Sequence, residues 1–408
     1  MSIIVDKRDI YSHLISPRRD FDKPIYNWHS FKHSYSKDLV DNILSEFKLK
    51  KGSWVMDPFC GGGTTLLASK QAGLNAHGFD ILPFSVFLSN VKTTDYNIKK
   101  LQGANKRFEN LKNCSSTLNR LPEILILRKA FNKSTENQLL QLKEQIQQIP
   151  ESKIQDFYNL AFLSILESVS NTSKSGGFLR IVNRDVNPDQ IRTLFLSKIQ
   201  SMISDVEINN HSNHKNEINI QAFLGDARQI PNSLSYNAII TSPPYPNRHD
   251  YTRIYSLELA FDFIKNNDDL KKIRYETLRS HVEAKKKYEA ISYRQPLILK
   301  KSIELVEKNG VNNPQIIGML NGYFEDMYLA LTEMSQHLYN KGKIAMVISN
   351  VRFAGINILV DEILSEIGKQ AELKPKGIWL ARYRGNSSQQ MKTYKRIPSR
   401  ESIVIWEK

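Results

Sequence analysis

The segment from residue 54 to residue 70 constrains the fold most, because it joins a short strand, a glycine loop and a helix. Residues 54–56 (Trp-Val-Met) favour a strand, residues 57–63 read Asp-Pro-Phe-Cys-Gly-Gly-Gly, and residues 64–70 favour a helix. This order opens the nucleotide-binding units of α/β folds. The loop matches neither the G-x-G-x-x-G dinucleotide pattern nor a phosphate loop, which requires Gly-Lys-Ser/Thr. Its glycines therefore indicate close approach of the backbone to another kind of ligand.

A second segment, residues 241–245, reads Thr-Ser-Pro-Pro-Tyr and follows the apolar run 236–240. Proline cannot donate to a sheet ladder, so a strand must end here, and two fixed φ angles make the backbone stiff. A rigid carbonyl beside a serine hydroxyl can hold an amino group, and the tyrosine can cover a flat ring. Taken alone, these residues are equally compatible with a proline turn at a strand end that buries a tyrosine.

Together the two segments resemble the amino-methyltransferase family, which methylates exocyclic amines of DNA bases with S-adenosylmethionine. The first motif of that family, Asp-Pro-Phe-x-Gly-x-Gly, is matched by Asp57, Pro58, Phe59, Gly61 and Gly63. Its catalytic motif, (Ser/Asp/Asn)-Pro-Pro-(Tyr/Phe), is matched by Ser242, Pro243, Pro244 and Tyr245. The resemblance covers about 25–95, 218–264 and 320–408, and it leaves two insertions without a counterpart.

Composition indicates a soluble protein with a large core. Of 408 residues, 40% are hydrophobic and 24% are charged, and no apolar run reaches the roughly 18 residues of a membrane span. The N-terminus lacks a signal-peptide pattern. Cys60 and Cys114 are too few for a disulfide framework or a zinc site, and His29 and His33 lack a third ligand with motif spacing. We therefore expect a cytoplasmic protein without membrane association or a metal.

The charge balance favours a polyanionic partner. There are 57 Lys and Arg residues against 42 Asp and Glu, which gives a net charge of +15 and a pI of about 9.5. Such a balance is weak evidence alone, but it is typical of proteins that bind nucleic acid. Combined with a base-modifying motif, it predicts double-stranded DNA as the partner.

The βαβ rhythm predicts an α/β fold with a doubly wound, mostly parallel sheet. The resemblance implies the seven-stranded, Rossmann-like sheet of methyltransferases, here with helical insertions. We expect these elements: helix 38–47 with Ser36 as its cap, strand 53–57, helix 64–72, strand 75–79, helix 82–91, strands 218–224 and 237–241, helix 323–338, strand 343–349, helix 357–368, and a hairpin of 376–383 with 401–407.

Two segments interrupt this rhythm and divide the chain. The methyltransferase domain is expected from 1–96, 216–264 and 311–408. Residues 97–215 form a helical insert, with a loop at its Ser-Lys-Ser-Gly-Gly stretch, and are a candidate for target recognition. Residues 265–310 form a basic helical insert that is a candidate for DNA contact, although interspersed acids also fit a solvated helical face.

Several residues are expected to hold the cofactor. A carboxylate at the end of a second strand can accept the ribose hydroxyls, and Asp80 has that position. The resemblance implies that Asp57 faces the ammonium group, that Phe59 packs on the cofactor, and that Asp226 lies near the adenine amine. The glycine loop and the start of its helix add Gly61, Gly63 and Thr64. An N-terminal motif that wraps the methionine end is matched loosely by Trp28, His29, Tyr35 and Ser36.

The expected catalysis needs no covalent intermediate. Hydrogen bonds from the amine to the Ser242 hydroxyl oxygen and the Pro243 carbonyl would localise its lone pair, within the rigid turn that Pro244 continues. Tyr245 would stack on a base extruded from the duplex. Cys60 follows Phe59 in the cofactor loop, so it would face the cofactor and not act as a nucleophile on a ring carbon.

The residue at position 242 bears on the target base. Adenine-specific relatives usually have Asp here, so the serine resembles the cytosine-N4 subgroup. This predicts a site-specific cytosine-N4 DNA methyltransferase of a restriction–modification or related defence system, with a cognate restriction endonuclease as a candidate partner. The alternatives are an adenine-N6 DNA methyltransferase and an RNA base amino-methyltransferase. A catalytically dead DNA-binding specificity protein is a third, against which the intact motifs argue.

Candidate DNA contacts come from three places. Arg248 and Tyr251 extend the catalytic loop, and Lys285 and Lys286 belong to the basic insert. A polar loop between the last two strands carries Arg384 and Asn386, and it looks like a recurrent tail of certain cytosine-N4 methyltransferases.

Overall fold

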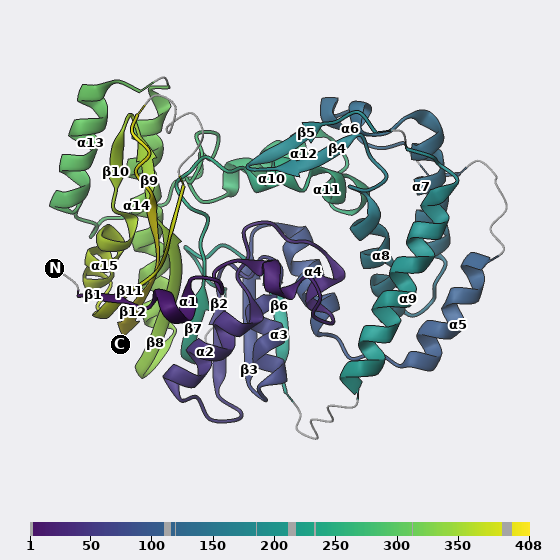
Figure 1. Ribbon diagram of the computed structural model, residues 1–408, viewed down its shortest axis with the longest axis horizontal. Coiled ribbons are helices and arrows are strands. Elements are labelled where there is room, and N and C mark those ends of the chain that lie inside the picture. Colours follow the sequence, from purple (N-terminus) through teal and green to yellow (C-terminus); the bar gives the residue numbers. More distant parts are fainter. Residues whose placement is uncertain are drawn as a thin grey trace.

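The computed structural model describes residues 3–109, 116–118, 120–184, 186–210, 218–231, 234–311, 313–385 and 394–408. An eight-stranded sheet lies at its centre (Figure 1). In spatial order its strands are β1 (Ile4–Asp6), β11 (Lys374–Arg384), β12 (Ser399–Glu407), β8 (Leu338–Ser349), β7 (Tyr236–Thr241), β2 (Trp54–Asp57), β3 (Asn75–Asp80) and β6 (Ile220–Leu224).

The predicted doubly wound, mostly parallel sheet is confirmed, with one strand more than expected. Only β12 runs antiparallel to its neighbours. The expected count of seven is wrong because residues 4–6 pair in parallel with residues 378–380 at the edge of the sheet. A three-residue strand is too short to show a hydrophobic alternation, so its pairing is visible only in the folded chain.

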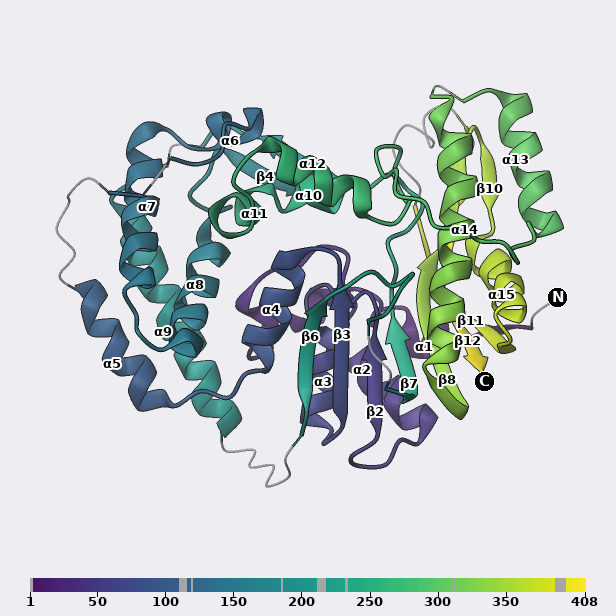
Figure 2. The ribbon, with the colours of Figure 1, turned by 180° about the vertical axis from the view of Figure 1, so that it is seen from behind.

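Helices cover both faces of the sheet. On one face lie α2 (Lys37–Phe47), α3 (Thr64–Gln71) and α4 (Pro83–Thr93), and on the other lie α14 (Gln315–Gln336) and α15 (Val360–Gln370) (Figures 1 and 2). Successive strand residues enter opposite cores, as the period of two requires. Val55 packs with the α2 side and Met56 with the α14 side.

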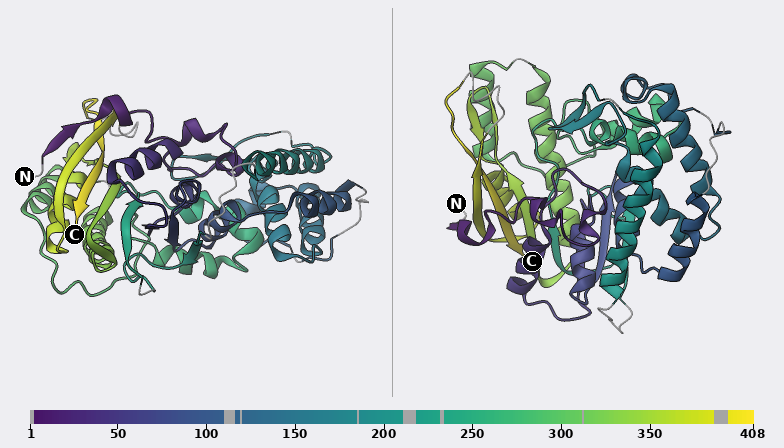
Figure 3. Two further views of the ribbon diagram at one scale, coloured as in Figure 1. Left: turned by 90° about the horizontal axis from the view of Figure 1, so that it is seen from below. Right: turned by 45° about the vertical axis from the view of Figure 1, so that its right-hand side comes forward.

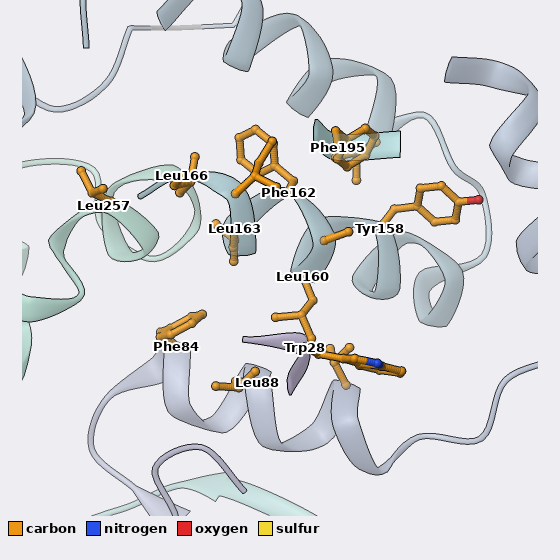
Figure 4. Close-up of a cluster of buried hydrophobic side chains, with 14 of the residues drawn as sticks. Trp28, Phe84, Leu88, Tyr158, Leu160, Phe162, Leu163, Leu166, Phe195 and Leu257 are labelled. Carbon is orange, nitrogen blue, oxygen red and sulfur yellow. The ribbon is translucent and has the colours of Figure 1, made fainter. Parts of the chain in front are cut away.

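The insert from 97 to 215 is helical as predicted. It contains α5 (Ile98–Glu109), α6 (Leu125–Ala130), α7 (Lys133–Gln147), α8 (Ser152–Ile165) and α9 (Gln190–Asn210). Its apolar core includes Phe162 and Phe195, and it continues into Trp28 of the N-terminal segment and Phe84 of α4 (Figure 4). The insert therefore shares one hydrophobic core with a helix that packs on the central sheet.

The loop expected at residues 173–177 is a β-hairpin instead. Strand β4 (Thr172–Ser175) pairs antiparallel with β5 (Phe178–Ile181), and Gly176 and Gly177 form the two-residue turn. Gly176 has φ of +58°, which glycine adopts without steric cost. A Gly-Gly pair is a recognised hairpin signal, but the flanking strands are too short and too polar to be evident.

The stretch from 265 to 310 is helical only near its ends, so a helical insert there is a partly wrong expectation. Three short helices, α10 (Tyr251–Ile254), α11 (Ser256–Asp262) and α12 (Asn267–Glu276), precede an irregular segment of residues 277–296, and α13 (Leu297–Asn309) follows Pro296. The irregular segment is fixed by buried hydrogen bonds from Arg279 to Asp326 of α14. These bonds hold the irregular segment against α14, where a helix would instead be held by packing of its apolar face. Figure 3 shows this part of the chain from two further sides.

Several short elements were not expected from the sequence. They are α1 (Arg8–Tyr11), two 3-10 helices at Pro17–Asp20 and Tyr26–Trp28, and a hairpin of β9 (Val351–Phe353) with β10 (Ile356–Ile358). In the part of the chain that the structure describes, no helix has both the length and the apolar character needed to cross a bilayer.

Candidate active site

The glycine loop between β2 and α3 places backbone at the carboxyl edge of the sheet. Gly61 and Gly63 have φ of +47° and +76°. A Cβ on Gly63 would lie 2.9 Å from the Ser89 Cα of α4, so this glycine allows α3 to pack closely on α4. Gly61, Gly62 and Thr64 line a cavity, whereas Gly63 does not.

That cavity, here called the strand-end pocket, lies where β2, β3 and β7 end. It encloses about 940 Å³ when its open mouth is included. Ligands of open α/β sheets bind at this edge. The predicted residues on its wall are Tyr35, Asp57, Phe59, Gly61, Thr64, Asp80, Asp226, Ser242 and Pro244, together with Tyr251. Ser36 is not on the wall: its hydroxyl oxygen accepts from Leu39 N at 3.3 Å and caps α2.

Asp80 lies at the end of β3 with both carboxylate oxygens oriented by backbone. Gly61 N donates to Oδ2 and Leu82 N donates to Oδ1, each at 2.9 Å. Burial raises the pKa of Asp80 to about 6, although these two hydrogen bonds favour the ionised form. Because each carboxylate oxygen has two lone pairs, Asp80 can still accept from two hydroxyl groups of a ligand.

Asp57 has most of its acceptor capacity filled by the protein. Its Oδ1 accepts from Thr241 Oγ1 at 2.6 Å and from Phe59 N at 3.1 Å, and its Oδ2 accepts from the Tyr35 hydroxyl at 3.0 Å. The side chain is buried, and burial raises its pKa. Asp57 therefore joins the ends of β2 and β7 to the N-terminal segment at the floor of the pocket.

Asp226 lies just after β6 and accepts hydrogen bonds from two side chains. Arg228 donates to both of its oxygens, at 2.9 and 2.7 Å, and the Tyr288 hydroxyl donates to Oδ2 at 3.1 Å. Burial alone would raise the pKa of Asp226, but the hydrogen bonds and charge of Arg228 outweigh it and lower the pKa. Lys286 also belongs here, because its Nζ lies 3.9 Å from Asp226 Oδ2 and 5.0 Å from the centre of the Tyr288 ring.

One wall of the pocket was missed by sequence reasoning. Thr277, Leu278, Ser280 and His281 line it from the irregular segment after α12. Arg279 holds that segment, because its guanidinium and backbone N donate to the fully buried Asp326 at 2.6–3.0 Å. No motif marks such a buried ion pair in a sequence. Phe31 was also missed, and it covers the glycine loop so closely that a Cβ on Gly61 or Gly62 would meet it at 2.9 Å.

The Ser-Pro-Pro-Tyr turn separates the strand-end pocket from a second cavity. Ser242 and Pro244 face the first, whereas Tyr245 lines the second, the outer cavity, of about 1,630 Å³ with its mouth. Ser242 Oγ donates to the Val347 carbonyl of β8 at 3.1 Å. This bond uses the hydroxyl proton. The Tyr245 hydroxyl lies 3.5 Å from the same oxygen, and one lone pair of the serine oxygen is still able to accept from a ligand. Pro243 is buried and lines neither cavity.

Two histidines border both cavities, and neither was expected at the site. The His33 and His249 rings lie 4.6 Å apart, and His33 Nε2 lies 3.3 Å from the Gly176 carbonyl of the hairpin turn. Burial, together with the charges of His33 and Arg384, lowers the pKa of His249 to about 3, so the ring is neutral at pH 7. The β4–β5 hairpin thereby contacts the loop that follows the Ser-Pro-Pro-Tyr turn. His29 is separate from this pair, buried 3.0 Å from Glu258. Across the described ranges, no three His, Cys, Asp or Glu side chains gather as a metal site.

The predicted DNA-binding residues are not brought together as one group. Arg248 and Arg384 line the outer cavity, whereas Tyr251 lies on the wall of the strand-end pocket, stacked on Phe31. Lys285 is exposed, with its Nζ 5.3 Å from the Tyr275 ring centre. Asn386 lies outside the described residues, as does Cys114. Cys60 is buried, and burial raises the pKa of its thiol well above the usual value, so it is not a thiolate.

Comparisons of the sequence with known proteins show its family. Residues 37–224 match the model described as D12 class N6 adenine-specific DNA methyltransferase. The chain is 31% identical over 462 aligned positions to Type II methyltransferase M.BsoBI of Geobacillus stearothermophilus, covering 99% of this chain and 90% of that one. It is 30% identical to Type II methyltransferase M.AvaI of Anabaena variabilis, with coverages of 97% and 89%. Among solved structures, rRNA methyltransferase aviRa from Streptomyces viridochromogenes has a TM-score of 0.35 at 11% identity over 97% of this chain and 96% of that chain, which is too low for any argument.

The strand-end pocket fits the methyl donor that such enzymes use. Asp80 offers acceptors for ribose hydroxyls, Phe59 and Leu82 offer apolar surface, and the glycine loop lets backbone approach the ligand. On its sequence relatives and on this site, the chain belongs to the Type II DNA methyltransferases, which take their methyl group from S-adenosylmethionine.

Proposed function

We propose that this enzyme methylates the exocyclic N4 amine of cytosine in double-stranded DNA, within a short specific sequence. One observation carries the amine chemistry of this proposal: the Ser242 hydroxyl donates its proton to the Val347 carbonyl at 3.1 Å, so its oxygen is an acceptor on the wall of the strand-end pocket. The choice of cytosine rests on the serine at position 242, where adenine-specific relatives usually have aspartate. An acceptor at this point suits a primary amine, which has two protons to donate.

The residues of the turn would activate the amine by orientation. A cytosine amine is a weak nucleophile because its lone pair is delocalised into the ring. Hydrogen bonds from its two protons to Ser242 Oγ and the Pro243 carbonyl would direct the lone pair towards the strand-end pocket. There S-adenosylmethionine supplies an electrophilic methyl group when bound. Orientation of this kind contributes about 7–11 kcal/mol in favourable cases.

The outer cavity is the candidate site for an extruded base. Tyr245 lines it and would stack on the base, which returns part of the few kcal/mol that extrusion costs. Arg248 and Arg384 on the same cavity would contact phosphates, and this is the surface where a basic chain of net charge +15 would hold DNA.

Adenine N6 is the second candidate target. The matching family model carries an adenine-N6 description, and the adenine amine offers the same two protons. The match ends at residue 224, however, before the turn that contains Ser242. The cytosine proposal therefore rests on residues that the family match does not include.

Mass spectrometry of nucleosides from DNA modified by the enzyme tests the proposal. N4-methylcytosine is the expected product, and Ser242→Ala should slow its formation. N6-methyladenine would overturn the choice of base and keep the amine mechanism. 5-Methylcytosine would overturn the mechanism, since ring-carbon attack needs a nucleophile and Cys60 is a buried thiol.

The relatives support a setting for this activity. M.BsoBI and M.AvaI are both Type II methyltransferases. We therefore propose that this chain belongs to a restriction–modification system, together with a restriction endonuclease that cuts the same target sequence. The test is protection: DNA modified by the enzyme should resist an endonuclease encoded nearby, and unmodified DNA should be cut.

A further inference from the structure

Asn350 is the residue at which the chain leaves β8, and its backbone is fixed on both sides. Its N–H donates to the Arg400 carbonyl of β12 at 2.9 Å, and its carbonyl accepts from Ser349 Oγ at 3.0 Å. The residue is 4% exposed, and it lines the outer cavity. The backbone groups are therefore occupied, and the side-chain amide is the group that a ligand in this cavity can meet.

The amide of Asn350 has a fixed orientation. Asp361 N, in the first turn of α15, donates to Asn350 Oδ1 at 3.2 Å. A backbone N–H can only donate, so the amide atom that faces it is the oxygen and the other atom is Nδ2. Across the described ranges, Nδ2 donates to no protein group, and it is not fully sealed in the interior. An amide donor without a protein partner thus lies at the wall of the outer cavity.

The position of Asn350 relative to Ser242 matches the length of a pyrimidine base. Val347, whose carbonyl accepts from Ser242 Oγ, lies three residues before Asn350. Three residues of extended chain span about 10 Å. Cytosine has its amine at one edge and its O2 carbonyl oxygen at the other, and a hydrogen bond beyond each edge gives a row of similar length. A base held at its amine by Ser242 therefore presents its far edge to Asn350.

We propose that Asn350 Nδ2 donates to O2 of the cytosine that is extruded into the outer cavity, and that Asn350 thereby determines which base is accepted. Ser242 Oγ and the Pro243 carbonyl hold the amine at one edge of the ring, and Asn350 holds the carbonyl oxygen at the other. The inference rests on the proposed cytosine substrate and names a residue that enforces this choice.

A donor at this place separates cytosine from the other bases. Adenine also has an exocyclic amine beside a ring nitrogen, but it carries a C–H bond where cytosine has O2. It would leave the Asn350 donor without an acceptor. Thymine has O2 but carries an oxygen in place of the amine, so it fails at Ser242. A site that hydrogen-bonds its substrate rejects ligands that leave a buried polar group unpaired.

The contact with α15 does not account for the amide donor. An aspartate would offer the same kind of acceptor oxygen to the start of a helix, so this contact uses Oδ1 alone. The difference supplies a sharp variant, because Asn350→Asp keeps the acceptor oxygen and removes the donor.

Kinetics on target duplexes that carry either cytosine or 2-thiocytosine at the methylated position test the inference, because sulfur is a weak acceptor. The wild type should prefer cytosine by about tenfold in kcat/KM. Asn350→Asp should lose most of this preference, because its carboxylate cannot donate to either base. Calorimetry should find its affinity for S-adenosylmethionine unchanged. A preference that is retained in Asn350→Asp would overturn the proposal.

Asn266→Asp is the matched control. Asn266 Oδ1 caps α12 by accepting from two backbone N–H groups of its first turn, and the side chain lines neither cavity. This variant should keep the preference of the wild type. Asn247 also lines the outer cavity, with its Oδ1 accepting from His249 N at 3.2 Å. A preference that is lost in Asn247→Asp and kept in Asn350→Asp would assign the contact to Asn247 and overturn the proposal.

A measurement on the unchanged protein decides the matter if Asn350→Asp does not fold. The wild type should methylate 2-thiocytosine about tenfold less efficiently than cytosine, and equal kcat/KM values would contradict a donor at O2. The nucleoside product separates this inference from the proposed function. N4-methylcytosine formed with equal kcat/KM on both bases would overturn the role of Asn350 alone. N6-methyladenine would overturn the cytosine substrate and, with it, this inference.

Discussion

At the residue scale, neighbouring side chains of the Ser-Pro-Pro-Tyr turn line different cavities, and Tyr245 is the clearest case. It follows Ser242 by three residues, yet it lines the outer cavity while the serine faces the strand-end pocket. A base and a methyl donor can therefore approach the same short turn from opposite sides. This division predicts that substitutions on one side alter one ligand and spare the other.

Tyr245→Ala should depress methyl transfer and leave the affinity for S-adenosylmethionine nearly unchanged. Stacking of a base on an aromatic ring contributes about 1–3 kcal/mol, so kcat/KM should fall by roughly 5- to 150-fold. Single-turnover kinetics and calorimetry measure the two effects. Tyr245→Phe is the matched variant, since it keeps the ring and should retain most activity. An equal loss of cofactor affinity would contradict this prediction, because it would mean that the Tyr245 ring contacts the cofactor in the strand-end pocket.

Asp80 should make cofactor binding depend on pH. Its pKa of about 6 means that the carboxylate is ionised at pH 7.5 and largely protonated at pH 5. Ribose hydroxyls donate best to the ionised form, so affinity should fall as pH falls through 6. Asp80→Asn should weaken binding by about 1.5–3 kcal/mol at pH 7.5. It should also remove this step from the pH profile, and a step that persists would belong to another group.

The same pKa shift carries a stability effect of opposite sign. An acid whose pKa is raised on folding binds its proton more tightly in the folded chain. Ionised Asp80 therefore destabilises the folded protein. As pH falls from about 7 to 4 and Asp80 takes up its proton, the free energy of unfolding should increase. Comparing urea midpoints of the wild type and Asp80→Asn across that range isolates the contribution.

At the scale of elements, the basic charge of residues 265–310 suggested that this insertion contacts DNA, but the two insertions lie at different cavities. The β4–β5 hairpin of the helical insert contacts His33 and His249 beside the outer cavity. The segment after α12 instead builds a wall of the strand-end pocket, and its Lys286 is directed to Asp226. Proximity to the outer cavity, not the density of lysines, identifies the candidate DNA surface.

Salt dependence of DNA binding tests that assignment. Each phosphate contact releases counterion, so log K falls linearly with log salt concentration. Arg248→Ala should weaken binding and reduce the slope by about 1, because Arg248 is exposed at the outer cavity. Lys285→Ala, a matched loss of one exposed charge, should change the slope less. A larger change of slope in Lys285→Ala than in Arg248→Ala would assign the phosphate contact to the segment after α12.

At the scale of the whole molecule, the helical insert and the methyltransferase sheet share a core. Leu160 of α8 and Leu88 of α4 belong to one buried cluster (Figure 4), and the Trp28 indole also donates to Asp205 of α9 at 2.9 Å. An insert held this way should not unfold separately from the sheet that it interrupts.

Calorimetry should therefore find one unfolding transition for the chain. Leu160→Ala removes a fully buried side chain and should cost about 2–5 kcal/mol. It should lower the temperature of that single transition. Leu305→Ala, at an exposed leucine of α13, is a matched control and should shift it little. Two separate transitions, with Leu160→Ala moving only one, would show that the insert is an independent unit.

The sequence by itself determined the parallel sheet and the places where two of its strands end in a glycine loop and a proline turn. Apolar strands of period two, a glycine loop and a proline turn are local patterns, and local sterics decide them. The helix at 37–47 with its Ser36 cap, the strand ending at Asp80 and the turn at 242–245 all lie within a few residues of where their patterns predicted.

Only the tertiary structure decided which residues share a cavity. Lys92 lies more than sixty residues after Asn27 and His29 in the chain, yet the three side chains line one cavity. Their meeting depends on how the N-terminal segment crosses the glycine loop. The wall at 277–281 depends on one buried ion pair, Arg279 with Asp326. Long-range contacts of this kind are set by packing between elements, and no periodicity in the chain records them.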